Sequence, residues 1–297
     1  MAEHVTVQHR AEELAARLPP LMVAAERVAT TVAQGVHGRR RVGQGDSFWQ
    51  FRQYEPGDAV QRIDWRESAK SMRLYIRQTE WEAAQSVWLW RDASASMDYA
   101  SAPTLPTKKA RADLLLVALA ALLVRGGERT TLLGSGMPPL SGRVALNRIA
   151  ASVDRQGQGQ SQGHGPSLPP RETLPRHAQL VLIGDFLSPL PELHALVNGF
   201  AAAGQRGHLL QVMDPAEETL PFDGRIRFAG IEERDEILIS RVESVRDEYV
   251  RRLAAHREGI EAIARAVGWS FATHRTDRTP HAALLALYAA LARLPGA

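Results

Sequence analysis

Short apolar runs alternate along this chain with longer segments in which apolar residues recur every three or four positions. The short runs lie at residues 87–90, 129–133, 180–183, 209–213 and 269–273. Most of them are β-forming and nearly continuous in apolar character, which is typical of strands buried on both faces of a parallel sheet. The periodic segments, which predict helices, lie at residues 108–125, 144–153, 242–267 and from 279 onward. Strands that alternate with helices in this way predict an α/β fold with a doubly wound, mostly parallel sheet.

By composition the chain divides into three parts. Residues 1–34 predict an N-terminal helical segment, which breaks at Pro19 and Pro20. Residues 35–85 predict a small β segment, and residues 86–297 predict the α/β domain. Within that domain, residues 156–170 are rich in Gly, Gln and Ser, so we expect a mobile loop that is too polar to pack. Because predicted strands continue after it, this loop is an insertion in the domain.

The small β segment carries an unusual density of charge. Its candidate docking residues are Arg52, Asp58, Arg62, Asp64 and Trp65. We expect the charged members to form an ion-pair and hydrogen-bond network that docks the segment onto the α/β domain, since such networks are more often architecture than catalysis. The three arginines at residues 39–41 would suit a nucleic-acid contact, but a solvated or intramolecularly paired basic run is the favoured interpretation.

The chain is organised around residues 86–98, where an apolar run stops at Asp92 and small hydroxyl residues follow. Asp92, Ser94 and Ser96 are spaced two apart, so a tight loop can turn three hard oxygens toward one point. That point lies at the carboxyl end of a predicted strand, where open α/β sheets place their ligands. Hard oxygens suit Mg²⁺ or Mn²⁺. The alternative is that Asp92 caps the next helix while the serines fill a polar turn.

Several short motifs together make the chain resemble a known bacterial family. They are Gly43-x-Gly45, Phe48-x-x-Phe51-Arg52-x-Tyr54-x-Pro56-Gly57-Asp58, Ile63-Asp64-Trp65, Ser68-Ala69, Asp92-x-Ser94-x-Ser96-Met97, Asp214-Pro215-Ala216-Glu217 and Leu220-Pro221-Phe222. From about residue 35 to the C-terminus, this combination is similar to the domain-of-unknown-function-58 (DUF58) family.

The resemblance implies a von Willebrand factor type A-like domain with a metal-ion-dependent adhesion site. It also implies an association with MoxR-type AAA+ ATPases. Asp185 follows the strand predicted at 180–183, where such domains supply a second carboxylate, so by resemblance it is the distal metal ligand. The other interpretation of Asp185 is a turn aspartate ahead of the helix that Ser188 and Pro189 open.

The chain departs from the family pattern in two places. Arg91 stands where similar domains usually carry an apolar residue. Its cation either pairs with Asp92 in competition with a metal or points to the opposite side. The family's threonine ligand has no clear match, and the candidates are Ser161, Ser167 and Thr173.

The composition of the chain excludes or disfavours several other classes of protein. The chain has 297 residues and no cysteine, which excludes disulfides, thiol nucleophiles and thiolate zinc sites. A formal net charge of +3, from 36 basic and 33 acidic residues, does not by itself indicate a nucleic-acid partner. The longest apolar stretch, residues 114–124, is far shorter than the roughly 20 residues that span a bilayer. With a polar N-terminus that has no signal-peptide core, the sequence predicts a cytoplasmic protein without a membrane span.

The functional prediction follows from the metal loop, because no other catalytic motif is found. The sequence contains no phosphate-binding loop, no His-Glu-x-x-His zinc motif and no nucleophile elbow. The leading hypothesis is therefore a module without enzymatic activity, in which a bound Mg²⁺ or Mn²⁺ receives an Asp or Glu of a protein partner. By resemblance it would work with a MoxR-type AAA+ ATPase in assembling or remodelling a client protein. The alternative is a metal-dependent hydrolase that acts on phosphoesters with the same acids.

Overall fold

A computed structural model describes residues 39–43, 47–55, 58–71, 73–83, 85–158, 165–229 and 236–292. The helical segment predicted over residues 1–34 lies outside these ranges. The described residues divide into two compact units, and the division falls between Gln85 and Ser86. Each unit is considered separately below.

The smaller unit is built on a three-stranded antiparallel sheet. Strand β3 (Tyr75–Ala83) lies in the middle, between β1 (Arg39–Gly43) and β2 (Ser47–Gln53). A 3₁₀ turn, η1 (Val60–Arg62), and a one-turn helix, α3 (Trp65–Ser68), connect β2 to β3. The arginine run at residues 39–41 therefore belongs to a strand, and it pairs through its backbone with Trp81, Glu82 and Ala83 of β3.

The larger unit contains a five-stranded sheet in which every pairing is parallel. Its order is β10-β7-β6-β4-β5. The strands are β4 (Ser86–Arg91), β5 (Arg129–Leu132), β6 (Gln179–Gly184), β7 (Arg206–Met213) and β10 (Ser270–Arg275). The predicted α/β class with a doubly wound sheet is confirmed, and the strand predicted at 269–273 lies at one edge of the sheet as β10.

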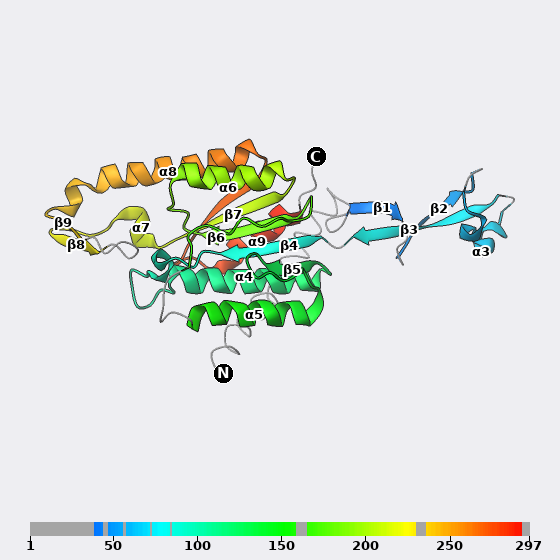
Figure 1. Cartoon of the computed structure of the whole chain (residues 1–297), viewed down its shortest axis with the longest axis horizontal. Helices are drawn as coiled ribbons and strands as arrows, with labels where there is room; N and C mark the ends of the chain where they lie inside the picture. Colours follow the sequence, from blue (N-terminus) through cyan, green and yellow to red (C-terminus); the bar gives the residue numbers. More distant parts are fainter. Residues whose placement is uncertain are drawn as a thin grey trace. The chain divides into compact units, whose positions relative to one another are not determined.

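Helices cover both faces of this sheet (Figure 1). The larger unit's helices are α4 (Lys108–Arg125), α5 (Gly142–Gln158), α6 (Leu190–Ala202), α7 (Pro215–Thr219), α8 (Arg246–Ala266) and α9 (Pro280–Ala292), with 3₁₀ turns η2 (Ala95–Asp98) and η3 (Val242–Ser244). Strands β8 (Ile226–Ala229) and β9 (Glu236–Ile239) pair with each other in a separate antiparallel ribbon. Within the described ranges, no helix has both the length and the apolar character needed to cross a membrane.

The apolar alternation of β4 separates two hydrophobic cores. Val87 and Leu89 point to the face covered by α4, α5 and α9, whereas Trp88 and Trp90 point to the face covered by α6 and α8. Helix α4 is apolar on nearly all sides because it lies between the sheet, α5 and α9. This buried helix begins at Lys108 beside the carboxyl ends of the strands, and its first residue thereby reaches the site described below.

The loop predicted at residues 156–170 overlaps a helix at its start, and residues 165–178 belong to no helix or strand. Helix α5 continues through Gln158 despite Gly157, and residues 159–164 lie outside the described ranges. Gly165 donates its backbone N–H to the Ala93 carbonyl at 3.0 Å, so the chain is packed again by this point. A Cβ on Gly165 would lie 2.7 Å from the Ala93 Cβ, and the missing side chain is what permits this approach. The mobility expected for this loop stays a prediction.

A close contact between β7 and the residue before β10 yields a stability prediction. A Cβ on Gly207 would lie 2.0 Å from the buried Trp269 ring, whereas a Cβ on Gly199 of α6 would meet nothing within 4 Å. We expect Gly207→Ala to lower the free energy of unfolding by about 1–3 kcal/mol or more through overpacking. The matched Gly199→Ala should raise it by about 0.5–1 kcal/mol because alanine favours the helix. Urea unfolding followed by circular dichroism measures both, and a neutral Gly207→Ala would show that the Trp269 ring can move aside.

Candidate metal centre

The two central strands of the sheet end in acids that lie side by side. Strands β4 and β6 are parallel neighbours, with Arg91 paired to Ile183, and each is followed directly by an aspartate, Asp92 or Asp185. The chain leaves β4 toward β5 and leaves β6 toward β7, so the order of the sheet reverses between them. Open α/β sheets bind their ligands at such a switch point. The Asp92 N–H donates to the Ile183 carbonyl at 2.8 Å and holds the two ends in register.

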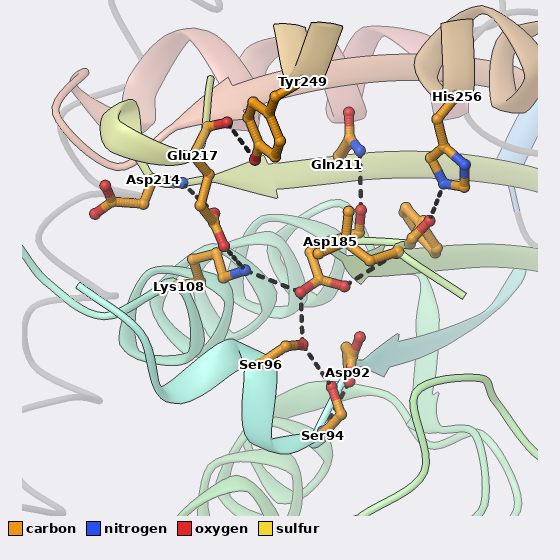
Figure 2. Close-up of polar contacts among 12 residues, drawn as sticks. Asp92, Ser94, Ser96, Lys108, Asp185, Gln211, Asp214, Glu217, Tyr249 and His256 are labelled. Carbon is orange, nitrogen blue, oxygen red and sulfur yellow. Dashed lines mark hydrogen bonds and ion pairs between the residues drawn. The ribbon is translucent and has the colours of Figure 1, made fainter. Parts of the chain in front are cut away.

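The four residues predicted for the site form one chain of oxygen atoms (Figure 2). Asp92 Oδ1 accepts the Ser94 N–H at 2.8 Å, which folds the loop back on itself. The Ser94 and Ser96 hydroxyl oxygens are 3.0 Å apart, and Ser96 Oγ donates to Asp185 Oδ2 at 2.6 Å. Turn η2 is anchored by the fully buried Met97. Asp92, Ser94, Ser96 and Asp185 therefore converge, although 89 residues separate the last two in sequence.

Asp92 differs from the other members of this group because one of its carboxylate oxygens has no partner within the described ranges. Its side chain is buried, and its Oδ2 atom has no hydrogen-bond partner among the described residues. Burial, and then the neighbouring Asp185 carboxylate, raise the pKa of Asp92 to about 7. Gly184 makes room for it, since a Cβ there would lie 2.9 Å from the Asp92 Cβ.

Asp185, by contrast, is held from several directions. Its Oδ1 atom accepts the Leu187 N–H at 3.2 Å, and its carbonyl accepts Nε2 of Gln211 at 2.9 Å. The next carbonyl, that of Phe186, accepts Nε2–H of His256 at 2.8 Å. Asp185 is thus a turn aspartate and also a partner of the serine loop, and its role as a distal metal ligand stays a prediction.

A buried lysine that sequence analysis missed completes the site. Lys108, the first residue of α4, is fully buried and donates from Nζ to Asp185 Oδ2 at 2.9 Å and to Glu217 Oε1 at 2.6 Å. Burial lowers the pKa of Lys108, but the two carboxylates outweigh it and the net shift is upward. Burial raises the pKa of Glu217 while Lys108 opposes that shift. The site therefore contains a built-in ammonium shared by two acids (Figure 2).

Glu217 is held in place by the short helix α7. Its other carboxylate oxygen accepts the Asp214 N–H at 2.9 Å, and Asp214 in turn accepts the Ala216 N–H, which makes a capping box. The sequence carried only an indirect signal for this arrangement. A lysine at the first position of a helix opposes the helix dipole, so a buried Lys108 is stabilised by acidic partners from elsewhere in the chain. The Asp214-Pro215-Ala216-Glu217 motif supplies one of them.

Arg91 does not compete for the site. Its Nε atom pairs with Asp113 Oδ1 of α4 at 2.5 Å, and its Nη1 donates to the Asp92 carbonyl at 3.3 Å. The guanidinium thus engages the backbone of Asp92 and not its carboxylate. Of the two expectations for Arg91, the structure shows the one in which it points away.

The three candidates for the missing threonine ligand differ in their positions. Ser167 lines the same pocket as Ser96 and Asp185, and it accepts a hydrogen bond from Ser188 at 3.0 Å. Thr173 is exposed, and Ser161 lies outside the described residues. The structure thus places only Ser167 at the site among the candidates that it describes.

The predicted docking residues lie in the smaller unit and are used largely within it. Arg52 Nη2 pairs with both oxygens of Asp58, at 2.8 and 2.9 Å. Asp64 was expected in the same ion-pair network, but its Oδ1 instead accepts the backbone N–H groups of Arg66 and Glu67 and caps α3. Trp65 is 62% exposed. Arg62 closes η1, and its side chain lies outside what the structure describes.

The larger unit's site fits a hard divalent cation. Asp92 Oδ2 is a buried carboxylate oxygen with no partner among the described residues, while Oδ1 of the same side chain accepts the N–H of Ser94, whose hydroxyl lies 3.0 Å from that of Ser96. When ionised, Asp92, Asp185 and Glu217 bring three negative charges against the single positive charge of Lys108. Among the residues that the structure covers, no group of three or more His, Cys, Asp or Glu is arranged to hold a metal, so this site depends on the serine hydroxyls.

Comparisons with known proteins find one family model and several uncharacterised relatives. A family model described as a protein of unknown function, DUF58, matches residues 50–259. Uncharacterised proteins of Mycobacterium bovis and Mycobacterium tuberculosis are each 28% identical over 279 residues, which cover 90% of this chain and 86% of the relative.

Two solved structures are also similar. One is an aerotolerance-related membrane protein from Bacteroides fragilis, with a TM-score of 0.40 and 17% identity over 70% of this chain and 98% of that chain. The other is the conserved hypothetical protein BatB from Bacteroides thetaiotaomicron, with a TM-score of 0.36 and 15% identity over 70% of this chain and 97% of that chain.

The shared ammonium predicts a large effect for one of two adjacent lysines. Lys108→Met leaves Asp185 and Glu217 buried without their cation, so we expect the free energy of unfolding in EDTA at neutral pH to fall by about 3–5 kcal/mol. Lys109→Met is the matched control, because the partner of Lys109, Asp98, is partly exposed and stays hydrated. Adding Glu217→Gln to Lys108→Met should recover part of the loss. Equal losses for the two lysine variants, measured by urea unfolding, would contradict the role assigned to Lys108.

The raised pKa of Asp92 predicts a pH dependence in the absence of metal. Because its folded-state pKa of about 7 exceeds its ordinary value of 3.8, the folded state binds the additional proton between these values. Asp92 therefore lowers stability as pH rises from about 4 to about 7, by at most about 1.4 kcal/mol per pH unit. In EDTA, Asp92→Asn should remove this contribution and unfold at higher temperature than the wild type above neutral pH, with the gap closing in acid. Parallel melting-temperature profiles for the two proteins would rule this out.

Proposed function

This chain belongs to the DUF58 family of proteins of unknown function, and we propose that it is a metal-dependent protein-interaction module. In this proposal a Mg²⁺ or Mn²⁺ ion at the candidate centre receives an Asp or Glu side chain of a partner protein. Asp92, Ser94 and Ser96 would hold the ion, with Asp185 as the distal acid. The bound ion would supply an open coordination position for a carboxylate oxygen.

One observation carries the proposal: Asp92 Oδ2 is buried and without a partner among the described residues, beside two hydroxyls at the switch point of the sheet. Buried carboxylate oxygens are normally hydrogen-bonded or bound to cations. Arg91 is engaged with Asp113, and Lys108 reaches Asp185 and Glu217. A divalent cation that binds Asp92 would satisfy its oxygen and balance the remaining negative charge.

The residues around the centre also favour recognition of an acid. A partner's carboxylate would approach a site whose own acids are already engaged, since Asp185 is bound by Ser96 and Lys108 and Glu217 by Lys108 and the Asp214 N–H. The backbone behind them is fixed by Gln211 and His256. A preorganised site of this kind binds with little loss of conformational entropy.

As the family resemblance implies, we propose a MoxR-type AAA+ ATPase as the partner with which this module assembles or remodels a client protein. Pull-down with the purified chain in Mg²⁺ and in EDTA tests this, with Asp92→Asn as the matched variant. A second acidic cluster around a two-metal site would favour the phosphoesterase alternative.

The metal itself makes the sharpest test. We expect millimolar Mg²⁺ or Mn²⁺ to raise the melting temperature of the wild type. Binding to the native state at 100 times the dissociation constant stabilises by about 2.7 kcal/mol, which corresponds to roughly 5–10 °C for a chain of this size. Asp92→Asn should abolish the response.

Asp98→Ala is the control, because Asp98 belongs to the same turn, η2, but pairs with Lys109 away from the oxygen chain. It should keep the full response to Mg²⁺. A wild type that is indifferent to both ions would refute the metal centre. A response that survives Asp92→Asn would place the metal elsewhere.

A further inference from the structure

A pocket of about 600 Å³ opens directly beside the metal centre, and Ser96 and Asp185 form part of its lining. The rest of the lining is largely apolar and comes from the loops after β6 and β7, from β8 and from α8. Its apolar and aromatic members include Leu187, Pro189, Leu220, Phe222, Phe228 and Tyr249. The volume is in the range of pockets that enclose a ligand group.

Hydrogen bonds from α8 fix the backbone of several residues that line this pocket. Arg246 donates to the carbonyls of Leu220 and Phe222, at 2.9 and 2.7 Å. The Tyr249 hydroxyl donates to the Glu217 carbonyl at 2.7 Å, as Figure 2 shows. The rings of Phe222 and Phe228 meet edge to face at 6.1 Å between centroids. The pocket is therefore part of the folded structure and needs little ordering on binding.

We propose that this pocket receives a bulky apolar side chain of the partner, from a residue close in sequence to the Asp or Glu that binds at the metal centre. This inference rests on the function proposed above and adds the chemistry of the recognised segment. Because Ser96 and Asp185 belong to both the pocket and the centre, one short peptide segment can place its carboxylate on the metal and its apolar side chain in the pocket. Leu187 is 45% exposed, so covering its side chain would remove apolar surface from water.

The acidic residues in the pocket lining further restrict which partner segment can bind. Glu192 and Glu217 also line the pocket, and of these only Glu217 is bound to Lys108. A run of acidic residues would bring like charges toward Glu192, which disfavours it. The recognised segment therefore combines a single acid with a large apolar neighbour.

A random linear-peptide library displayed on phage tests this with the full-length chain, panned in millimolar Mg²⁺ and eluted with EDTA. We expect the enriched peptides to share an Asp or Glu next to Phe, Leu, Ile, Met or Trp. One such synthetic peptide is then titrated against two variants that both remove an exposed leucine or valine side chain, Leu187→Ser at the pocket and Val144→Ser on α5, where the side chain is 58% exposed.

Leu187→Ser should raise the peptide's dissociation constant about tenfold, while Val144→Ser should leave it unchanged. Both variants should keep the melting-temperature response to Mg²⁺. Replacing the peptide's apolar residue by alanine should raise the dissociation constant by a similar factor, and Leu187→Ser should then have no further effect on it. The proposal would be overturned by enriched peptides that share an acid but no apolar neighbour, or by no enrichment at all. It would also be overturned if 3-phenylpropanoate bound as tightly as the peptide, because the site would then recognise a small acid and not a peptide segment. If Mg²⁺ produced no melting response while peptides still bound the pocket in EDTA, the metal-dependent function would fall and the apolar recognition would remain.

Discussion

The ammonium of Lys108 is the interaction on which the carboxyl end of the sheet depends. Parallel pairing of β4 and β6 brings Asp92 and Asp185 to one edge, and the capping box of α7 adds Glu217. Three acids gathered in a buried place would repel one another without a cation. Lys108 reaches two of them only because α4, whose apolar residues fix it between the sheet, α5 and α9, begins at this edge. The packing of an apolar helix therefore decides the electrostatics of the site.

The two aspartates that the topology makes equivalent are used differently. Asp185 receives hydrogen bonds from Ser96, Lys108 and the Leu187 N–H, and it is fully engaged. Asp92 receives only the Ser94 N–H on one oxygen, and the other oxygen has no partner within the described structure. Both carboxylate oxygens of Asp185 therefore have partners already, whereas one oxygen of Asp92 has none among the described residues. The serine hydroxyls lie between the two acids. An added cation would act at Asp92, because satisfying that oxygen displaces no existing bond.

Much of the fold could be read from the sequence because its signals are local. The apolar runs that became β4, β6 and β7 and the apolar helix α4 follow from periodicity over a few residues, and acids directly after two strands indicate the edge where ligands bind. The ammonium could not be found in this way. Lys108 lies 77 residues from Asp185 and 109 from Glu217, and at the polar start of a helix it looks like a solvated charge. Asp64 is the opposite case, because it was assigned to an ion-pair network although its oxygen is used locally to cap α3.

In the proposed function, the candidate metal centre and the apolar pocket would divide recognition of a partner between two physical interactions, metal coordination and apolar burial. Mg²⁺ gives up its water reluctantly, so exchanging a bound water for a single carboxylate yields specificity for an acid but modest affinity. Burial of an apolar side chain supplies affinity without regard to charge. In this chain the loop after β6 contributes to both, because Asp185 belongs to the centre and Leu187, two residues later, to the lining of the pocket. A partner that meets only one of the two terms would bind weakly, and the short distance along the chain between them makes their joint recognition a property of one peptide segment.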